Sequence, residues 1–388
     1  MTISAQISDH EGVNRRSAVV VGVCLSVIAV SAFLVLPVFI GAAVVSMDLS
    51  ERQVGFLASA VMSGSAVSSI FTLFWIRKVN WRLASYVALS ILLLGYLGAI
   101  ASQDVTMFTA CLFLASLGGG SAYSLALTCL SDNRQADRCF GYSVAAQVTF
   151  QVIGMLVLPV VAESLGVQGL LTIFAALAGL GLFLTRYLPE SGVEITVQGV
   201  GSALYRPTVL AALAGCFFFF FNVGVLWTYI ERIGDSAGFD AGLIGLSLAV
   251  GVAFGIPGAL GASWCGNRFG RLRPLALGAV LTVVALILLL SSTLSLTAYM
   301  VSLALYNFAW NFSLAFQYAA VNAVDETGRG VALAPAFHGG GGAVGPAVAA
   351  LFVSAGNFTA VSLFAGVAVL LSLALFALAL GTHGSPKE

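Results

Sequence analysis

The chain has 388 residues, of which 60% are hydrophobic and 8% are charged, whereas about 25% of residues are charged in ordinary soluble domains. Its 16 basic and 16 acidic residues leave no net charge. So few charges cannot cover a soluble globule with polar surface, which excludes a soluble enzyme, a nucleic-acid-binding protein, a disordered regulator and a secreted disulfide scaffold. The composition therefore predicts a polytopic membrane protein.

Apolar runs long enough to cross a bilayer follow one another along the chain. A bilayer core about 30 Å thick requires about 20 residues of helix. The twelve predicted transmembrane helices cover residues 17–45, 53–76, 83–102, 106–130, 140–162, 167–188, 207–230, 241–265, 274–292, 297–321, 331–354 and 358–381. We expect an all-α membrane protein in which a cytoplasmic linker, 189–206, joins an N-terminal bundle of six helices (1–188) to a C-terminal bundle of six (207–388).

The basic residues orient these helices. With the N-terminus in the cytoplasm, 14 of the 16 Lys and Arg residues fall on the cytoplasmic side, and only Arg52 and Arg232 face outward. Cytoplasmic loops of membrane proteins carry this excess of positive charge. The short connections are typical of a multi-pass protein of a bacterial cytoplasmic (inner) membrane, and we expect both termini to be cytoplasmic.

The two halves repeat each other weakly. Gly55 opens the second predicted helix and Gly245 opens the eighth, 190 residues later. Basic loops that begin at Arg77 and Asn267 follow these same two helices, again 190 residues apart. Parallel repeats of this kind are typical of transporters that bind their substrate near the middle of the membrane. The alternative is a coincidence of short matches.

The second basic loop carries a family resemblance. Asn267-Arg268-Phe269-Gly270-Arg271 resembles the cytoplasmic D-R-x-G-R-R signature of the major facilitator superfamily, with Asn in place of the acid. The twelve helices, the two halves and the longer middle connection resemble the same family over nearly the whole chain. The resemblance implies a pseudo-symmetric 6+6 fold and transport by alternating access.

The basic loops are the candidate gating elements. In the family they hold the two helix bundles in one access state. The resemblance implies this role for residues of both basic loops and for two arginines that precede the fifth and eleventh helices. The first-half loop lacks the acid and the glycine of the signature. The candidate gating residues are Arg77, Arg82, Arg138, Asn267, Arg268, Gly270, Arg271 and Arg329. The alternative is that arginines at helix ends only bind backbone carbonyls and water.

All acids and all Lys and Arg residues fall in loops, termini or helix ends, which leaves His338 as the titratable side chain of consequence inside the predicted spans. Buried charges usually mark ion or substrate pathways, so their absence argues against a cation pump with a buried carboxylate. His338 lies about seven residues, roughly 10 Å, inside its span. It is a candidate for proton coupling, because histidine gains and loses protons near neutral pH. The alternative is a neutral histidine bonded to a backbone carbonyl.

A glycine motif follows His338. Gly341 and Gly345 have the small-xxx-small spacing that permits close helix contact, and Pro346 permits a kink. We expect a role in helix packing and hinge motion. The motif resembles the G-x-x-x-G-P element that antiporters of the family carry in their fifth helix, which favours export only weakly because here it lies in the eleventh.

Neutral polar and aromatic residues gather on a few predicted helices. Tyr306, Trp310 and Gln317 recur at helical spacing and share one face. We expect amides and aromatic rings of this kind to line the substrate path. The candidates are Tyr123, Gln147, Gln151, Phe218, Asn222, Tyr306, Asn307, Trp310, Asn311 and Gln317. The alternative is hydrogen bonding between helices.

The sequence therefore predicts a monomeric secondary active transporter of a small organic solute, aromatic or otherwise weakly acidic, with the proton as candidate coupling ion. The direction of transport stays open. The alternatives are an efflux permease for neutral amphipathic drugs or metabolites and, more remotely, a membrane sensor that does not transport. No catalytic cluster, metal site or cofactor motif is recognisable, so we expect no enzyme, and we expect the bilayer but no nucleic acid as a partner.

Overall fold

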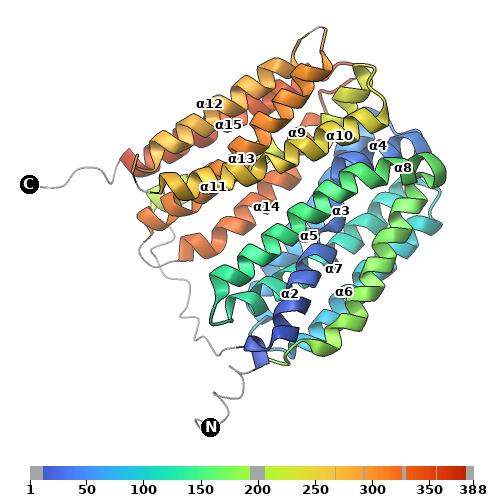
Figure 1. The fold of residues 1–388 in the computed structure, drawn as a ribbon, viewed down its shortest axis with the longest axis vertical. Coiled ribbons are helices and arrows are strands. Elements are labelled where there is room, and N and C mark those ends of the chain that lie inside the picture. Colours follow the sequence, from blue (N-terminus) through green and yellow to red (C-terminus); the bar gives the residue numbers. More distant parts are fainter. Residues whose placement is uncertain are drawn as a thin grey trace, which may run out of the picture. The chain divides into compact units, whose positions relative to one another are not determined.

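The computed structural model describes residues 12–192, 206–266, 268–291, 293–325, 329–354 and 356–381. Within these ranges the chain is almost entirely helical, and the only β feature is an isolated bridge between Ser354 and Asn357. Figure 1 shows long helices running side by side. The prediction of an all-α membrane fold is confirmed.

The helices of the first half account for the first six predicted spans. They are α2 (Arg16–Ile28), α3 (Ser31–Leu34), α4 (Leu36–Met47), α5 (Glu51–Trp75), α6 (Trp81–Ala101), α7 (Val105–Ser131) and α8 (Ala136–Leu184), followed by the short 3-10 helix η1 (Thr185–Tyr187). The side chains of Asn80 and Asp104 accept hydrogen bonds from backbone N–H groups at the starts of α6 and α7. These caps satisfy donors that a helix start leaves unpaired.

The helices of the second half account for the other six. They are α9 (Pro207–Ser236), α10 (Ala241–Ala253), α11 (Gly255–Cys265), α12 (Leu272–Leu289), α13 (Leu296–Val324), α14 (Arg329–Ala349) and α15 (Thr359–Gly381). α9 continues six residues beyond the predicted end at 230. Asp240 and Ser295 cap α10 and α13 in the same way as the caps of the first half.

Three predicted features of single helices differ in the structure, and proline or glycine explains each. The first span is broken around Val35, two residues before Pro37, and the eighth is broken at Phe254, three residues before Pro257. Proline removes a backbone donor and clashes with the preceding turn. The fifth and sixth spans form one element, α8, that turns sharply at Gly166, where φ is 61° and ψ is −162°. Only glycine adopts this conformation readily.

Eight of the described helices are long and apolar enough to cross a membrane by length and composition. α13 and α14 are also long enough but are more polar. α13 carries the amides of Asn307, Asn311 and Gln317, and α14 carries His338 among its glycines. These two helices hold five of the ten predicted substrate residues and the predicted proton residue.

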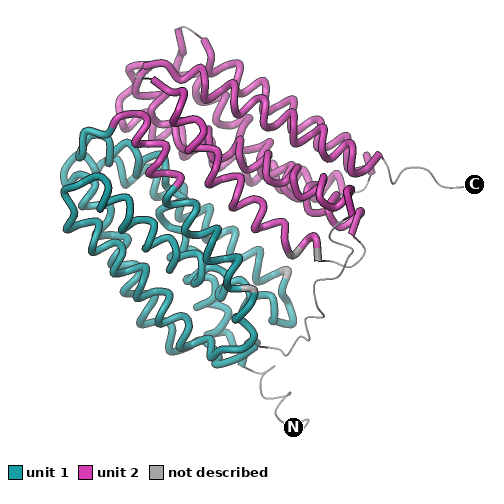
Figure 2. Tube along the Cα trace, turned by 180° about the vertical axis from the view of Figure 1, so that it is seen from behind, with its two compact units in different colours: residues 1–49, 60–197 teal, residues 50–59, 198–388 magenta. Residues whose placement is uncertain are grey.

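The chain divides into two compact units, which Figure 2 shows in different colours. Unit 1 comprises residues 1–49 and 60–197, and unit 2 comprises residues 50–59 and 198–388, apart from the positions outside the described ranges. The first nine residues of α5 thus pack with unit 2, although the sequence repeat places α5 in the N-terminal half. The predicted bundle boundaries at 188 and 207 stay a prediction.

Within unit 2, α14 packs tightly against α9. A Cβ atom added at Gly341 would collide with the carbonyl oxygen of Phe217, and one added at Gly345 would lie 2.5 Å from the carbonyl oxygen of Phe221. The glycine motif therefore brings two backbones together where a larger residue would push them apart.

We predict that Gly341→Ala lowers the stability of the folded protein by about 1–3 kcal/mol, because the added methyl group overpacks this contact. Its neighbour Gly340 provides a matched control, since a Cβ there would make ordinary contacts of 3.6 Å with the Phe217 ring. Thermal unfolding in detergent measures both variants. Equal melting temperatures for Gly340→Ala and Gly341→Ala would contradict the packing.

Candidate functional site

Four of the predicted substrate residues and His338 form a buried layer inside unit 2, on α9, α13 and α14. The Tyr306 hydroxyl on α13 faces the Asn222 side chain on α9. Tyr306 is 2% exposed and Asn222 is 1% exposed. These two side chains form the first polar pair of the layer, in which neither Tyr306 Oη nor Asn222 Oδ1 has a hydrogen-bond partner among the described residues.

Gln317 and His338 form the second polar pair. His338 Nε2 lies 3.0 Å from Gln317 Oε1, and both residues are buried. Since an amide oxygen only accepts, His338 Nε2–H is the donor in this arrangement. The imidazole is stacked on the Phe220 ring, with the ring centres 4.2 Å apart, and the edge of Tyr318 meets it from another side.

Aromatic rings extend from His338 to Trp310. Trp310, one turn after Tyr306 on α13, makes edge contacts with Phe220 and Trp227, with ring centres 6.1 Å and 6.0 Å apart. Phe220 in turn lies against His338. We call Asn222, Tyr306, Trp310, Gln317, His338 and Phe220 the polar–aromatic layer. Sequence reasoning missed Phe220, although it lies in the run of five Phe residues that precedes Asn222.

Several polar atoms of this layer have no partner among the described residues. They are Asn222 Oδ1, Tyr306 Oη and Gln317 Nε2. An unpaired polar group in an apolar interior costs about 1–3 kcal/mol. Such atoms in a membrane protein are suited to receive a polar ligand or water.

Other predicted substrate residues of unit 2 use their amides locally. Asn307 Nδ2 donates to Leu303 O and Asn311 Nδ2 donates to Asn307 O, both at 3.0 Å. Asn311 also lies against Gly255 of α11. Phe218 contacts the rings of Phe217 and Phe221. None of these contacts brings the three predicted residues to the polar–aromatic layer, and their role in the substrate path stays a prediction.

Two predicted residues of unit 1, Tyr123 and Gln147, belong to a separate polar chain. Tyr123 on α7 lies beside Gln147 on α8. Gln147 Nε2 donates to Ser143 Oγ at 3.0 Å, and Ser143 Oγ lies 2.6 Å from Ser26 Oγ on α2. Gln151 lies one turn further along α8 and is 9% exposed. This chain connects three helices of the unit.

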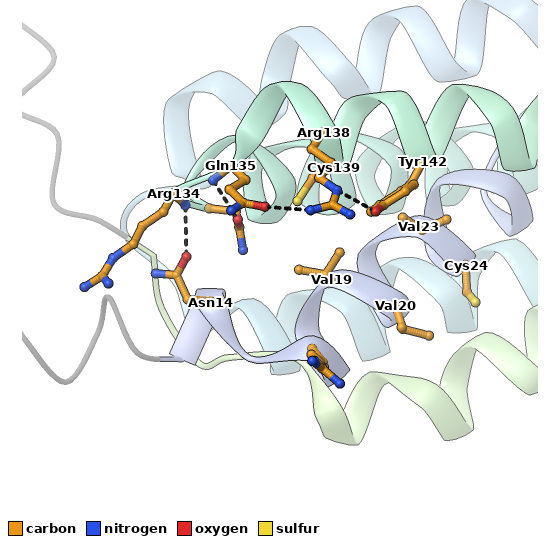
Figure 3. Close-up of a pocket in the computed structure, with 12 residues that line it drawn as sticks. Asn14, Val19, Val20, Val23, Cys24, Arg134, Gln135, Arg138, Cys139 and Tyr142 are labelled. Carbon is orange, nitrogen blue, oxygen red and sulfur yellow. Dashed lines mark hydrogen bonds between the residues drawn. The ribbon is translucent and has the colours of Figure 1, made fainter.

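A cavity of about 730 Å³ lies between α2 and α8 in unit 1. Figure 3 shows Val19, Val20, Val23 and Cys24 along one wall and Arg138, Cys139 and Tyr142 along the other. Arg138 Nε donates to Tyr142 Oη at 2.6 Å, and its Nη1 lies 3.5 Å from Gln135 Oε1. Arg16 and Arg134 complete the lining, which contains no carboxylate among the described residues.

The predicted gating residues of the first-half loop bind acids of their own unit. Arg77 holds Asp132 through two hydrogen bonds of 2.5 and 2.9 Å. Arg82 pairs with Glu190 at 3.0 Å and donates to Leu188 O. Sequence reasoning did not identify Asp132 and Glu190 as partners of these arginines. The only indication in the sequence is that both acids lie in loops beside basic segments.

The second-half loop is partly described. Arg268 lies over the Trp264 ring at 5.4 Å, and Gly270 has a φ of 69°. Arg271 Nε is buried without a partner among the described residues. Asn267 lies outside the described residues, and Arg329 is described only as the backbone start of α14. Gating by these residues stays a prediction.

The structure adds a charged cluster that sequence reasoning missed. Arg232, near the end of α9, binds Glu51 at the start of α5 and also Asp235. The prediction that α9 ends at 230 left Glu231 and Arg232 outside the membrane span. The available signal was the close spacing of Glu231, Arg232 and Asp235 directly after an apolar run.

Comparison with known proteins identifies the family. The model of the Major Facilitator Superfamily matches residues 19–334. The chain belongs to the Major Facilitator Superfamily. It is therefore a multi-pass membrane protein of a transporter family, as the resemblance of its loops implied.

Relatives and solved structures agree with this membership. An uncharacterized MFS-type transporter of Escherichia fergusonii, YcaD, is 23% identical over 249 residues; the match covers 63% of this chain and 65% of the relative, just under two thirds of its length. The nucleoside transporter NupG (D323A mutant) superimposes with a TM-score of 0.78 at 13% identity, covering 93% of this chain and 98% of that one. The D-xylose-proton symporter superimposes with a TM-score of 0.75 at 14% identity, covering 93% and 96%. These structural likenesses show the superfamily fold.

We predict that Gln317 and His338 stabilise the fold as a pair. In a double-mutant cycle with Gln317→Leu and His338→Phe, which keeps an aromatic ring beside Phe220, we expect a coupling energy of about 1 kcal/mol, the usual value of one buried hydrogen bond. Denaturant unfolding in detergent measures it. A control cycle pairs His338→Phe with Ser302→Ala and should be additive. Additivity in both cycles would contradict the hydrogen bond.

Proposed function

We propose that this chain is a secondary active transporter that moves a small organic solute, aromatic or weakly acidic, across the cytoplasmic membrane by alternating access. The proposal depends above all on one observation. Three buried polar atoms on α9 and α13, Asn222 Oδ1, Tyr306 Oη and Gln317 Nε2, have no partner among the described residues. A solute that bonds with them would supply the missing partners.

The chemistry of the layer favours an aromatic or partly apolar solute. Phe220, Trp227 and Trp310 offer ring faces and edges, while Asn222 and Gln317 offer both donors and acceptors. Such a surface gives orientation through a few hydrogen bonds and affinity through apolar contact. No charged side chain belongs to the layer, so it suits a solute that is neutral where it binds.

The cavity of unit 1 supports the weakly acidic character of the solute. Three arginines, Arg16, Arg134 and Arg138, line it beside the valines of α2. Guanidinium groups beside an apolar wall suit the carboxylate of an organic acid. We propose that this cavity attracts the solute from the cytoplasmic side and that the polar–aromatic layer binds it.

His338 has a defined part in the proposal. Its bond to Gln317 Oε1 holds the amide so that Nε2 stays available to the solute. Proton coupling through His338 stays part of the proposal, and relatives with this fold include a D-xylose-proton symporter. Comparing the pH profile of transport in wild type and His338→Ala tests this part, and an unchanged profile would contradict it.

The test of the binding site is a thermal-shift screen of the purified protein with aromatic acids, aliphatic carboxylates, nucleosides, sugars and lipophilic cations. A ligand that binds only the folded state raises its melting temperature. We predict that aromatic or other weak acids raise the melting temperature of the wild type. Tyr306→Phe should weaken ligand affinity at least about tenfold, equivalent to about 1.4 kcal/mol, and should therefore reduce this shift. Without ligand, Tyr306→Phe should be as stable as wild type, because it removes an unpaired hydroxyl.

Ser302→Ala is the matched control, one turn before Tyr306 on α13. Its hydroxyl is buried but donates to Ala285 O at 2.9 Å. This variant should melt at a lower temperature and keep the full ligand shift. Stabilisation by chemically varied neutral or cationic lipophilic compounds, equal in wild type and Tyr306→Phe, would contradict the proposal and favour the efflux permease.

A further inference from the structure

The charged cluster at the end of α9 is held by short contacts within unit 2. Arg232 Nε and Nη2 lie 3.2 and 3.1 Å from Glu51 Oε1, and Arg232 Nη1 lies 2.8 Å from Asp235 Oδ2. The side chains of Arg232 and Glu51 are only 15% and 9% exposed, whereas Asp235 is 52% exposed. The Glu51–Arg232 pair is therefore largely withdrawn from water.

Two carboxylate oxygens of the cluster are buried and lack partners. They are Glu51 Oε2 and Glu231 Oε2, which have no hydrogen-bond partner within the part of the chain that the structure describes. The Glu231 carboxylate interacts electrostatically with Arg232 and with the acids Asp235 and Glu51. The titratable and charged groups that face Glu231 and Glu51 come from three helices: Glu51 from α5, Tyr229, Glu231, Arg232 and Asp235 from α9, and Tyr299 from α13.

The charges of this cluster do not balance when every acid is ionised. Arg232 pairs with Glu51 and Asp235, and Glu231 adds a third carboxylate beside these contacts. The negative charge of Glu231 is disfavoured there by burial and by repulsion from the neighbouring acids. A single proton on Glu231 removes both penalties.

We propose that Glu231 is a proton-binding site at which one proton, taken from water, is held while Arg232 pairs with Glu51 and Asp235. The proton adds to a carboxylate oxygen to give a neutral carboxylic acid. The unpartnered, buried Glu231 Oε2 is the acceptor that the geometry favours.

The same cluster fixes the start of α5. Tyr229 Oη donates to the carbonyl oxygen of Glu51 at 3.0 Å, and Ser59 Oγ donates to Ala343 O at 2.5 Å two turns later. Loss of the proton leaves a second buried carboxylate that competes with Glu51 for Arg232. Deprotonation therefore loosens residues 51–59 from α9 and α14. If the proposed function holds, this link between the proton and α5 would couple protons to transport. Proton binding itself does not depend on the proposed function.

Infrared titration of the full chain in detergent tests proton binding directly. Exposed carboxyl groups titrate near about pH 4, so at about pH 6 they are ionised and give no carboxylic acid carbonyl band. We expect wild type to keep such a band at about pH 6 and to lose it at higher pH. Glu231→Gln should remove it, and Glu51→Gln, which removes a neighbouring negative charge, should shift the pH at which it is lost. Glu163→Gln, at an exposed position of α8, is the control and should leave it unchanged.

Amide hydrogen exchange of residues 51–59 tests the coupling. After correction for intrinsic chemistry, we expect exchange in wild type to rise when the band disappears and to become independent of pH in Glu231→Gln. A wild type without the band at about pH 6, or a band that survives in Glu231→Gln, overturns the proposal. The wild-type titration decides this even if a variant fails to fold, and neither readout requires a transported solute.

Discussion

The need to give buried polar groups a partner governs this structure. Inside a bilayer the backbone satisfies itself through helices, and side-chain amides, hydroxyls and charges are left to find partners in one another. Most do so: Ser143 bonds with Ser26 and Gln147, Asn307 donates to its own helix, and Tyr299 donates to Ile230 O. Five of the eight exceptions among the described residues lie in two places of unit 2, the polar–aromatic layer and the charged cluster of Arg232, and the others are Ser85, Arg271 and Ser313.

The two places differ in chemistry and complement each other. The layer around Trp310 is uncharged and aromatic, and it offers hydrogen bonds that suit an organic solute. The cluster around Arg232 has an excess of carboxylates, and it suits a proton. α9 carries parts of both, since Asn222 and Arg232 lie ten residues, about 15 Å, apart on it. One helix therefore contributes to the proposed solute site and to the proposed proton site.

Much of the fold could be predicted from the sequence, because apolar runs and basic loops are direct consequences of the bilayer. Single-helix details were less predictable. Pro37 and Pro257 lie near breaks that hydropathy does not register, and α9 continues past residue 230, where Arg232 pairs with Glu51, a residue distant in sequence. Helical spacing predicted one face for Tyr306, Trp310 and Gln317 of α13. It could not tell that Asn307 and Asn311 bond to their own backbone, since spacing defines a face and not the partner that the face meets.

The most direct test of the account is a high-resolution cryo-electron microscopy structure of the chain bound to a compound that stabilises it. The account predicts ligand density against Trp310 and Phe220, within hydrogen-bond distance of Asn222 Oδ1, Tyr306 Oη or Gln317 Nε2. Density confined to the cavity between α2 and α8, with waters pairing those three atoms, would contradict the central claim that the polar–aromatic layer is the solute site.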